Sequence, residues 1–151
     1  GVITPEVEAL RSRFGLPGMK VLQFAFDGNP DNPHLPRHHG EHSVVYTGTH
    51  DNDTAVGWWE HVDEQTRDRI RSCLLDPDEA MPWAFIHLAL ESTARLAVVP
   101  AQDLLGLGSQ SRMNTPGTAQ GNWAWQAPAG AFDENLAATV RALVAAADRL
   151  T

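Results

Sequence analysis

The chain has 151 residues, of which 42% are hydrophobic, so its length and composition fit one globular domain with a core of ordinary size and exclude a disordered segment. Eleven Lys and Arg residues against nineteen Asp and Glu residues give a formal net charge of -8, which disfavours nucleic acids and anionic membranes as partners. No apolar run approaches the roughly 20 residues of a membrane-spanning helix and no leader-like segment opens the chain, so we expect a cytoplasmic protein. Cys73 is the only cysteine, which rules out an internal disulfide and a cysteine metal site.

The order of apolar, capping and turn residues predicts alternating helices and strands. Thr4 and Pro5 are a typical helix start, Gly15 and Pro17 are a typical helix end, and Asp133 is a typical cap for a last helix. The expected strands are 19–26, 43–49 and 96–100, the further expected helices are 53–62, 63–75 and 81–95, and the expected irregular segments are 27–42 and 101–126.

Strands that alternate with helices are typical of a parallel sheet, so the fold class is α/β. Three strands make a small sheet, whereas a closed parallel barrel needs about 250 residues. The chain also opens on a helix cap and begins with Gly1. We therefore interpret residues 1–151 as the C-terminal segment of a (β/α)8 TIM barrel, comprising the last three strands with their helices. In such barrels the chemistry lies on loops after the strands.

A group of polar residues, His50-Asp51-Asn52-Asp53, follows the second expected strand. Asp, Asn and Thr at a helix start accept hydrogen bonds from free backbone N–H groups, and we prefer this capping role for Asp53 and partly for Thr54. Capping explains His50 and Asp51 less well, because adjacent polar side chains at the end of a buried strand cost free energy unless they bind something.

A metal site is a second interpretation of this region, because it contains His34, His38, His39, His42 and His50. Their spacing matches no closed metal site, no HExxH motif occurs, and four of the five lie in a loop of solvated composition. We therefore expect no metal ion.

The tryptophans divide into two sets. Trp58, Trp59 and Trp83 lie at helical positions, where core packing is the usual role. Trp123 and Trp125 alternate within a loop rich in Gly and Asn, where both core packing and a flat face for a sugar ring remain open.

Six blocks, in this order, identify a family resemblance: "GVITPEVEALRSRFGLPGMKVLQFAFDG", "NPHLP", "VVYTGTHDNDT", "GWW", "SRMNTPGT" and "GNWAW". From Gly1 to about Gln126 the chain resembles the amylomaltase-type 4-α-glucanotransferases, or disproportionating enzymes, of the α-amylase clan. The resemblance implies a barrel enzyme that moves α-1,4-linked glucan segments from a donor to the 4-hydroxyl of an acceptor sugar with retention of configuration. It implies maltooligosaccharides and α-1,4-glucans as partners and no cofactor, and it does not predict an oligomeric state.

The resemblance also assigns residues. It makes Asp51 the third catalytic carboxylate, which stabilises an oxocarbenium-like transition state without transferring a proton. The remaining matched positions are expected to contact substrate: His50 binds sugar hydroxyls, and Phe24, Asp27, Asn114 and Trp123 line the substrate groove.

Two further carboxylates, a nucleophile and an acid/base, are needed for this chemistry. The family pattern places both upstream of Gly1, and Glu6 and Glu8 lie in the first turn of a helix, where acids favour the helix dipole. Gln126 stands where the resemblance predicts Arg. The alternative to a glucanotransferase fragment is a non-catalytic glucan-binding module that uses Trp123 and Trp125.

Overall fold

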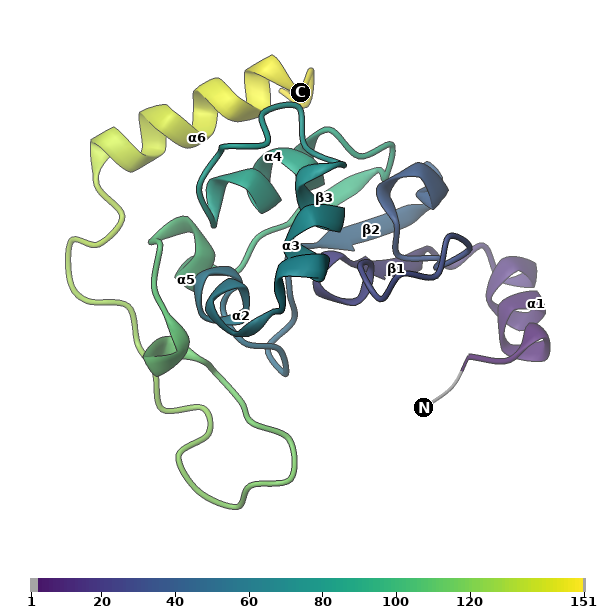
Figure 1. Cartoon of the computed structure of the whole chain (residues 1–151), viewed down its shortest axis with the longest axis horizontal. Coiled ribbons are helices and arrows are strands. Elements are labelled where there is room, and N and C mark those ends of the chain that lie inside the picture. Colours follow the sequence, from purple (N-terminus) through teal and green to yellow (C-terminus); the bar gives the residue numbers. More distant parts are fainter. Residues whose placement is uncertain (1–2, 151) are drawn as a thin grey trace.

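A three-stranded parallel sheet forms the centre of the computed structural model, which describes residues 3–150 (Figure 1). The strands are β1 (Gly18–Val21), β2 (Ser43–Tyr46) and β3 (Leu96–Val98), in the order β1-β2-β3. In the register, Met19 lies beside Val44, which lies beside Leu96. The predicted α/β class and parallel sheet are confirmed.

Six α-helices and three short 3-10 helices accompany the sheet in the described residues. Asp63 and Asp133 accept hydrogen bonds from the N–H groups of Thr66 and Leu136 at 2.8 Å each, so both cap helices, which confirms the cap predicted at Asp133 and the helix start expected at Asp63. The α-helices are α1 (Pro5–Arg13), α2 (Ala55–His61), α3 (Glu64–Arg71), α4 (Trp83–Leu90), α5 (Ala101–Leu104) and α6 (Glu134–Ala146), and the 3-10 helices are η1 (Leu22–Phe24), η2 (Pro36–His38) and η3 (Ser109–Ser111).

The hydrophobic core lies between one face of the sheet and the helices that follow β2. The Phe85 ring, which is fully buried, lies 6.0 Å from the Phe26 ring and 5.4 Å from the Trp58 ring. Trp58, Trp59 and Cys73 pack partly buried against this core, which confirms the core role predicted for Trp58 and Trp59. The buried members of the core are Leu22, Ala25, Phe26, Leu35, Val45, Ala55, Ile70, Phe85, Leu88, Ala89 and Ala94.

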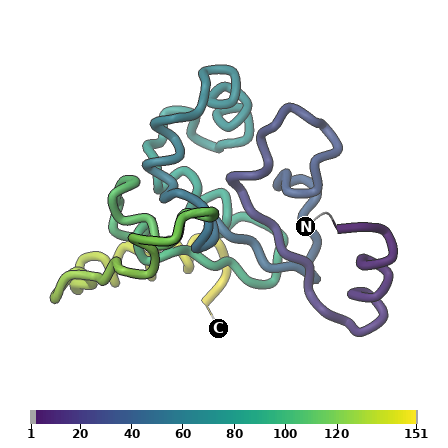
Figure 2. The backbone as a smooth tube through the Cα atoms, turned by 90° about the horizontal axis from the view of Figure 1, so that it is seen from below, coloured from purple at the N-terminus to yellow at the C-terminus, as the bar shows by residue number. Residues whose placement is uncertain are grey.

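The opposite face of the sheet is apolar and partly uncovered, although Val21, in the same row as Val98, is fully buried. Val45 faces the core, whereas Met19, Leu96 and Val98 project from the other side and are 56%, 57% and 40% exposed. Helix α1 does not cover this face: it buries no residue and lies apart from the other helices (Figures 1 and 2). The sheet therefore has one packed face and one face that is only partly covered.

Several predicted boundaries are wrong, most clearly that of the first strand. The run 19–26 does not continue as a strand, because the N–H of Ala25 bonds to the carbonyl of Leu22 in a 3-10 turn. The turn still buries apolar side chains, and an apolar run alone does not distinguish a strand from another buried conformation. Similarly, the second strand ends at Tyr46, α3 ends at Arg71, α4 covers only Trp83–Leu90 and β3 ends at Val98.

Helix α6 is attached to the rest of the molecule mainly at α4, beside which it lies (Figure 1). It contains no fully buried residue. The Arg149 guanidinium, just after the helix, donates hydrogen bonds to the backbone carbonyls of Leu90, Ser92 and Ala94. These bonds connect the end of the described chain to the connection between α4 and β3.

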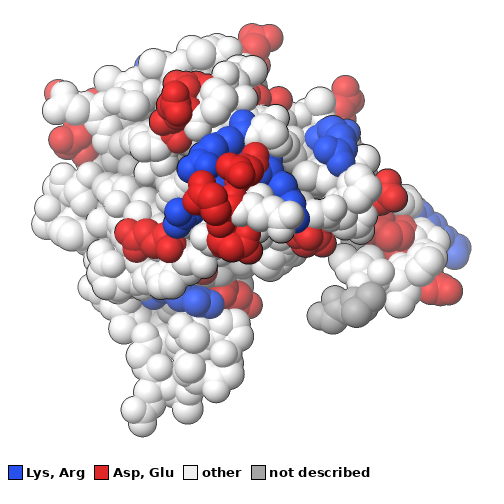
Figure 3. Space-filling model, in the orientation of Figure 1, with Lys and Arg blue, Asp and Glu red and all other residues white. Residues whose placement is uncertain are grey.

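Charges of both signs are interspersed on the face that carries α3 (Figure 3). Arg71 pairs there with Glu64 at 2.6 Å and with Asp68 at 2.9 Å. This face carries no purely basic patch of the kind that attracts a phosphate backbone. No helix within residues 3–150 has the length and apolar character needed to cross a membrane.

Candidate functional site

The segment 47–54 connects β2 to α2 and carries the predicted catalytic pair. Thr54 caps α2, because its hydroxyl oxygen accepts a hydrogen bond from the N–H of Gly57 at 3.1 Å. The capping role predicted for Asp53 is wrong. Its carboxylate instead accepts hydrogen bonds from the N–H of Thr54 at 2.8 Å and from the Ser109 hydroxyl at 2.7 Å. A Cβ at Gly57 would lie 2.2 Å from Ser109 Oγ, so this close approach requires glycine.

His50 and Asp51 lie next to each other at the surface of this segment. His50 Nε2 is 3.3 Å from Asp51 Oδ1, and the two side chains are 56% and 49% exposed. The Asn114 side-chain amide donates to Asp51 Oδ1 at 2.6 Å, and its backbone N–H donates to the His50 carbonyl at 3.1 Å. The Trp123 ring lies 5.0 Å from the His50 ring. The structure thus brings together four of the six predicted site residues.

Arg112 supports this group and was not predicted from the sequence. Its guanidinium donates to the backbone carbonyl of Asp51 at 2.7 Å and to that of Asn114 at 2.8 Å. It therefore fixes the acid and the amide that holds the acid. The only sequence indication was its position in the block "SRMNTPGT", two residues before Asn114.

Trp123 adopts a backbone conformation that is unusual for a residue other than glycine. Its φ angle is 60°, and its N–H donates to the carbonyl of Met113 at 2.7 Å. Such conformations cost about 1–3 kcal/mol and persist where the surroundings hold them. The Trp123 side chain is 62% exposed, which leaves its ring available for contact from outside. Trp125 is less exposed, and Gln126 lies at the surface.

Phe24 and Asp27, the other two predicted site residues, follow β1 and form a separate group. Phe24 is 51% exposed and its ring meets the His34 ring edge-on at 5.6 Å. Hydrogen bonds from the Asn32 side chain and from a nearby backbone N–H lower the pKa of Asp27, which favours its carboxylate form. Because β1 and β2 are parallel neighbours, these residues and Asp51 follow the same edge of the sheet.

A cavity of about 160 Å³ adjoins His50, although Asp51 does not line it. His50 and Trp123 line it together with Arg112, and Gln102 and Asp103 from α5 line it as well. Burial raises the pKa of Asp103, whose side chain is 1% exposed, although hydrogen bonds from Thr47 and Ala55 act in the opposite direction. The site therefore has an exposed acid at its surface and a second, buried acid behind it.

Four of the five histidines considered as metal ligands, those of the loop 27–42, have other hydrogen-bond partners. The rings of His34, His38, His39 and His42 each hydrogen-bond to backbone or hydroxyl groups. Burial lowers the pKa of both His34 and His39, which favours neutral rings. Within residues 3–150, no group of three or more His, Cys, Asp or Glu side chains is arranged to hold a metal ion.

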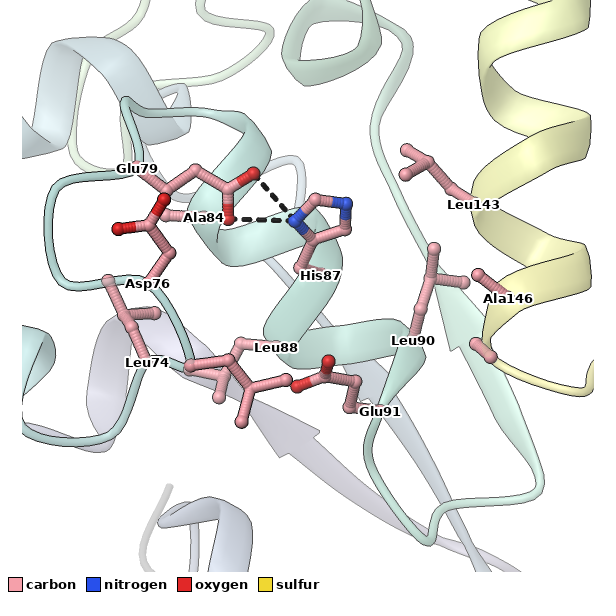
Figure 4. Close-up of a pocket in the computed structure, with 12 residues that line it drawn as sticks. Leu74, Asp76, Glu79, Ala84, His87, Leu88, Leu90, Glu91, Leu143 and Ala146 are labelled. Atoms are coloured by element: carbon pink, nitrogen blue, oxygen red, sulfur yellow. Dashed lines mark hydrogen bonds and ion pairs between the residues drawn. The ribbon is translucent and has the colours of Figure 1, made fainter.

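A larger cavity of about 320 Å³ lies between α4 and α6 (Figure 4). Leucines and alanines of both helices and of the segment 74–79 line it, and His87 Nδ1 pairs there with Glu79 Oε1 at 2.6 Å. None of the predicted site residues lines it.

The family described as 4-alpha-glucanotransferase matches residues 1–131. The chain belongs to the 4-alpha-glucanotransferase family. Among its relatives, the 4-alpha-glucanotransferase of Thermus thermophilus is 52% identical over 158 aligned residues, which cover 99% of this chain and 32% of the relative. The Synechocystis sp. enzyme of the same name is 55% identical over 128 residues, covering 83% of this chain and 25% of the relative. The chloroplastic or amyloplastic 4-alpha-glucanotransferase of Arabidopsis thaliana is 50% identical over 137 residues, covering 90% and 24%.

Solved structures agree with this family assignment. The amylomaltase from Streptococcus agalactiae, solved in complex with acarbose, superposes with a TM-score of 0.94 at 28% identity, and the match covers 100% of this chain and 31% of that one. The amylomaltase from Corynebacterium glutamicum shares the fold with a TM-score of 0.66 at 18% identity, over 99% of this chain and 28% of that one. The chain thus spans about a third or less of the length of these relatives and solved structures.

Proposed function

We propose that residues 1–151 form the C-terminal segment of a TIM-barrel catalytic domain, and that the whole domain transfers α-1,4-glucan segments to the 4-hydroxyl of an acceptor sugar with retention. Asp51 carries the proposal. It is an acid at the carboxyl edge of a parallel sheet, held by Asn114 at 2.6 Å and placed beside His50. Acids in this position in parallel barrels are typically catalytic.

The partly uncovered face of the sheet supports the barrel. In a closed barrel the inner faces of the strands pack against one another. Met19, Leu96 and Val98 lie on the partly uncovered face with 40% or more of each exposed, and burying a side chain of this size contributes about 1.5–3 kcal/mol. Further strands beside β1 and β3 would bury these residues and pair the two free edges of the sheet. The match to about a third of the Streptococcus agalactiae amylomaltase agrees with this interpretation.

Asp51 would act electrostatically. A retaining glycosyl transfer passes through transition states in which positive charge develops on the sugar ring, and a fixed carboxylate stabilises that charge more than it stabilises the ground state. The Asn114 amide holds Oδ1, and among residues 3–150 no hydrogen bond engages Oδ2. Oδ2 is therefore free to accept hydrogen bonds from sugar hydroxyls.

The neighbouring side chains suit a sugar. The exposed Trp123 ring offers an apolar face for the carbon side of a pyranose, and His50, 5.0 Å from it, offers a ring nitrogen for a hydroxyl. Phe24 and Asp27, at the same edge of the sheet, would extend the groove and contact further sugar units. The ligands are then maltooligosaccharides and α-1,4-glucans. The nucleophile and the acid/base would come from the part of the barrel that precedes this chain, and the proposed reaction uses no cofactor.

The test is incubation of the full-length protein with maltotriose, followed by chromatography of the products. A glucanotransferase releases glucose and forms longer maltodextrins, whereas a hydrolase forms only shorter sugars. A full-length protein that binds maltodextrins but leaves them unchanged would support the alternative, a glucan-binding module. The three relatives named above favour the transferase, because each is named as one. The cytoplasmic location stays a prediction, since the Arabidopsis thaliana relative is named as chloroplastic or amyloplastic.

A further inference from the structure

The buried carboxylate of Asp103 connects the two ends of the segment that carries His50 and Asp51. Asp103 Oδ2 accepts a hydrogen bond from the Thr47 hydroxyl at 2.6 Å, and Oδ1 accepts one from the N–H of Ala55 at 2.7 Å. Thr47 directly follows β2 and Ala55 is the first residue of α2. Both are 0% exposed. One side chain therefore fixes the point where the segment leaves the sheet and the point where it enters the helix.

A carboxyl group in this position costs free energy. A buried carboxylate loses its hydration, and two hydrogen bonds recover only part of that loss. Burial accordingly raises the pKa of Asp103. An apolar side chain would fill the same space at lower cost but would leave the N–H of Ala55 and the hydroxyl of Thr47 without this partner. The free-energy cost of burying the Asp103 carboxylate is therefore consistent with a role in holding the segment in place.

The same part of the chain also holds the middle of the segment. Arg112 donates to the Asp51 carbonyl at 2.7 Å, and Ser109 donates to Asp53 at 2.7 Å. Residues 101–114, which follow β3, thus contact segment 47–55 at both ends and in its centre. Among these residues, only Asp103 contacts both ends of the segment.

We propose that Asp103 is a positioning residue: by fixing Thr47 and Ala55 it sets the place of the Asp51 carboxylate relative to the sugar, without touching the sugar itself. The kinetic part of this inference rests on the proposed transferase function. The expected effect is large, because a displacement of about 1 Å in a catalytic group can lower the rate about a hundredfold.

The experiment compares two variants of Asp103 in the full-length protein. Asp103→Ala removes both hydrogen bonds. Asp103→Asn is the matched control: its Oδ1 still accepts from Ala55, and its Nδ2 can donate to the Thr47 oxygen, so both connections remain although the charge is gone. We expect Asp103→Ala to lower kcat by roughly tenfold to a hundredfold with little change in KM. Asp103→Asn should restore most of the rate.

Amide hydrogen exchange measures the positioning itself. In the unliganded protein, Asp103→Ala should speed exchange in residues 48–54, while the sheet and α3 keep their protection. Normal kcat and normal exchange in a folded Asp103→Ala variant would overturn the proposal. An equal loss of kcat in Asp103→Asn would also overturn it, since that result would assign the effect to charge and not to position.

A second variant, at Thr47, tests the proposal if Asp103→Ala does not fold. Thr47→Val removes one hydroxyl at nearly constant volume and breaks only the bond to Oδ2. Faster exchange in residues 48–54 is again expected, with a smaller fall in kcat, and unchanged exchange would refute the proposal. Exchange needs no substrate. A wild-type protein without transferase activity would therefore refute the proposed function, while the exchange data would still decide whether Asp103 fixes the segment.

Discussion

Replacing Asp51 with Asn in the full-length protein should abolish most of the turnover while leaving the fold intact. The new side chain has the same size, and its oxygen can still accept the hydrogen bond that Asn114 now donates at 2.6 Å. Because the Asp51 side chain is 49% exposed, the substitution behaves as a surface change, with an effect on the free energy of unfolding within about 0.5 kcal/mol. For a domain of this size or larger, that shifts Tm by no more than about 2 °C.

The rate should change far more than the stability. Losing one preorganised electrostatic contact with the transition state typically lowers kcat by about a hundredfold to a thousandfold, or about 2.7–4 kcal/mol. KM should change much less, because the carboxylate acts mainly on the charge that develops in the transition state. The assay is glucose release and maltodextrin formation from maltotriose over a range of substrate concentrations, with Tm measured on the same samples.

Two control variants make this result specific to Asp51. Asp63→Asn removes one negative charge from the cap of α3, and Asn caps helices equally well, so rate and Tm should stay unchanged. Asp53→Asn tests the neighbouring acid: an amide oxygen can still accept from Thr54, and the amide nitrogen can donate to Ser109. If Asp51→Asn keeps more than about a tenth of wild-type kcat, or Asp53→Asn loses as much, then Asp51 is the wrong acid.

The chain of 151 residues alone should not convert maltotriose, because the proposed nucleophile and acid/base lie outside it; glucose release by the pure chain would contradict this. The full-length enzyme should keep its activity in excess chelator, and an activity that is lost there and restored by one divalent ion would revive the metal interpretation. Arg112→Lys should lose at least one of the two hydrogen bonds to the carbonyls of Asp51 and Asn114. A charged hydrogen bond is worth about 1.5 kcal/mol, so kcat should fall about tenfold, and an unchanged kcat would show that Arg112 does not support catalysis. Burial lowers the pKa of His39 below its ordinary 6.5, so the unfolded chain takes up a proton that the folded chain excludes. The contribution of His39 to the free energy of unfolding should thus be fully present above pH 6.5 and be lost as the pH drops through the folded pKa. In His39→Gln, Tm should depend less on pH, and an unchanged pH profile would refute this origin.

Local rules accounted for the order of the strands and longer helices, but not for α5 and η3, which lie in the segment 101–126 that was expected to be irregular. Pro5, Asp63 and Asp133 act on the backbone within three residues, so their effect can be predicted without the fold. Strand and helix ends depend instead on packing. The first strand stops at Val21, and Leu22 and Ala25 are buried from a 3-10 turn instead. Thr54 and not Asp53 caps α2 because Ser109, from a distant segment, binds the Asp53 carboxylate.

The residues of the candidate site also divide into those that the sequence could predict and those that depend on the fold. His50 and Asp51 could be singled out because two polar residues after a buried strand need a reason. Asn114 could be connected to Asp51 only through the family resemblance, since 63 positions separate them. Asp103 and Arg112 could not be predicted from the sequence. The Ala55 partner of Asp103 is 48 positions away, and the Asp51 partner of Arg112 is 61 positions away. Nothing in the local sequence distinguishes a buried acid on a short helix from an exposed one.

The contacts of Arg149 have a consequence for which parts of the protein open together. The carbonyls of a helix end and of the turn after it lack partners within the helix, and Arg149 supplies them at Leu90, Ser92 and Ala94. When α6 detaches, these carbonyls lose that partner, so the connection into β3 loosens at the same time. We therefore expect hydrogen exchange to quicken in α6 and in the connection 90–95 together, although the two lie far apart in the sequence.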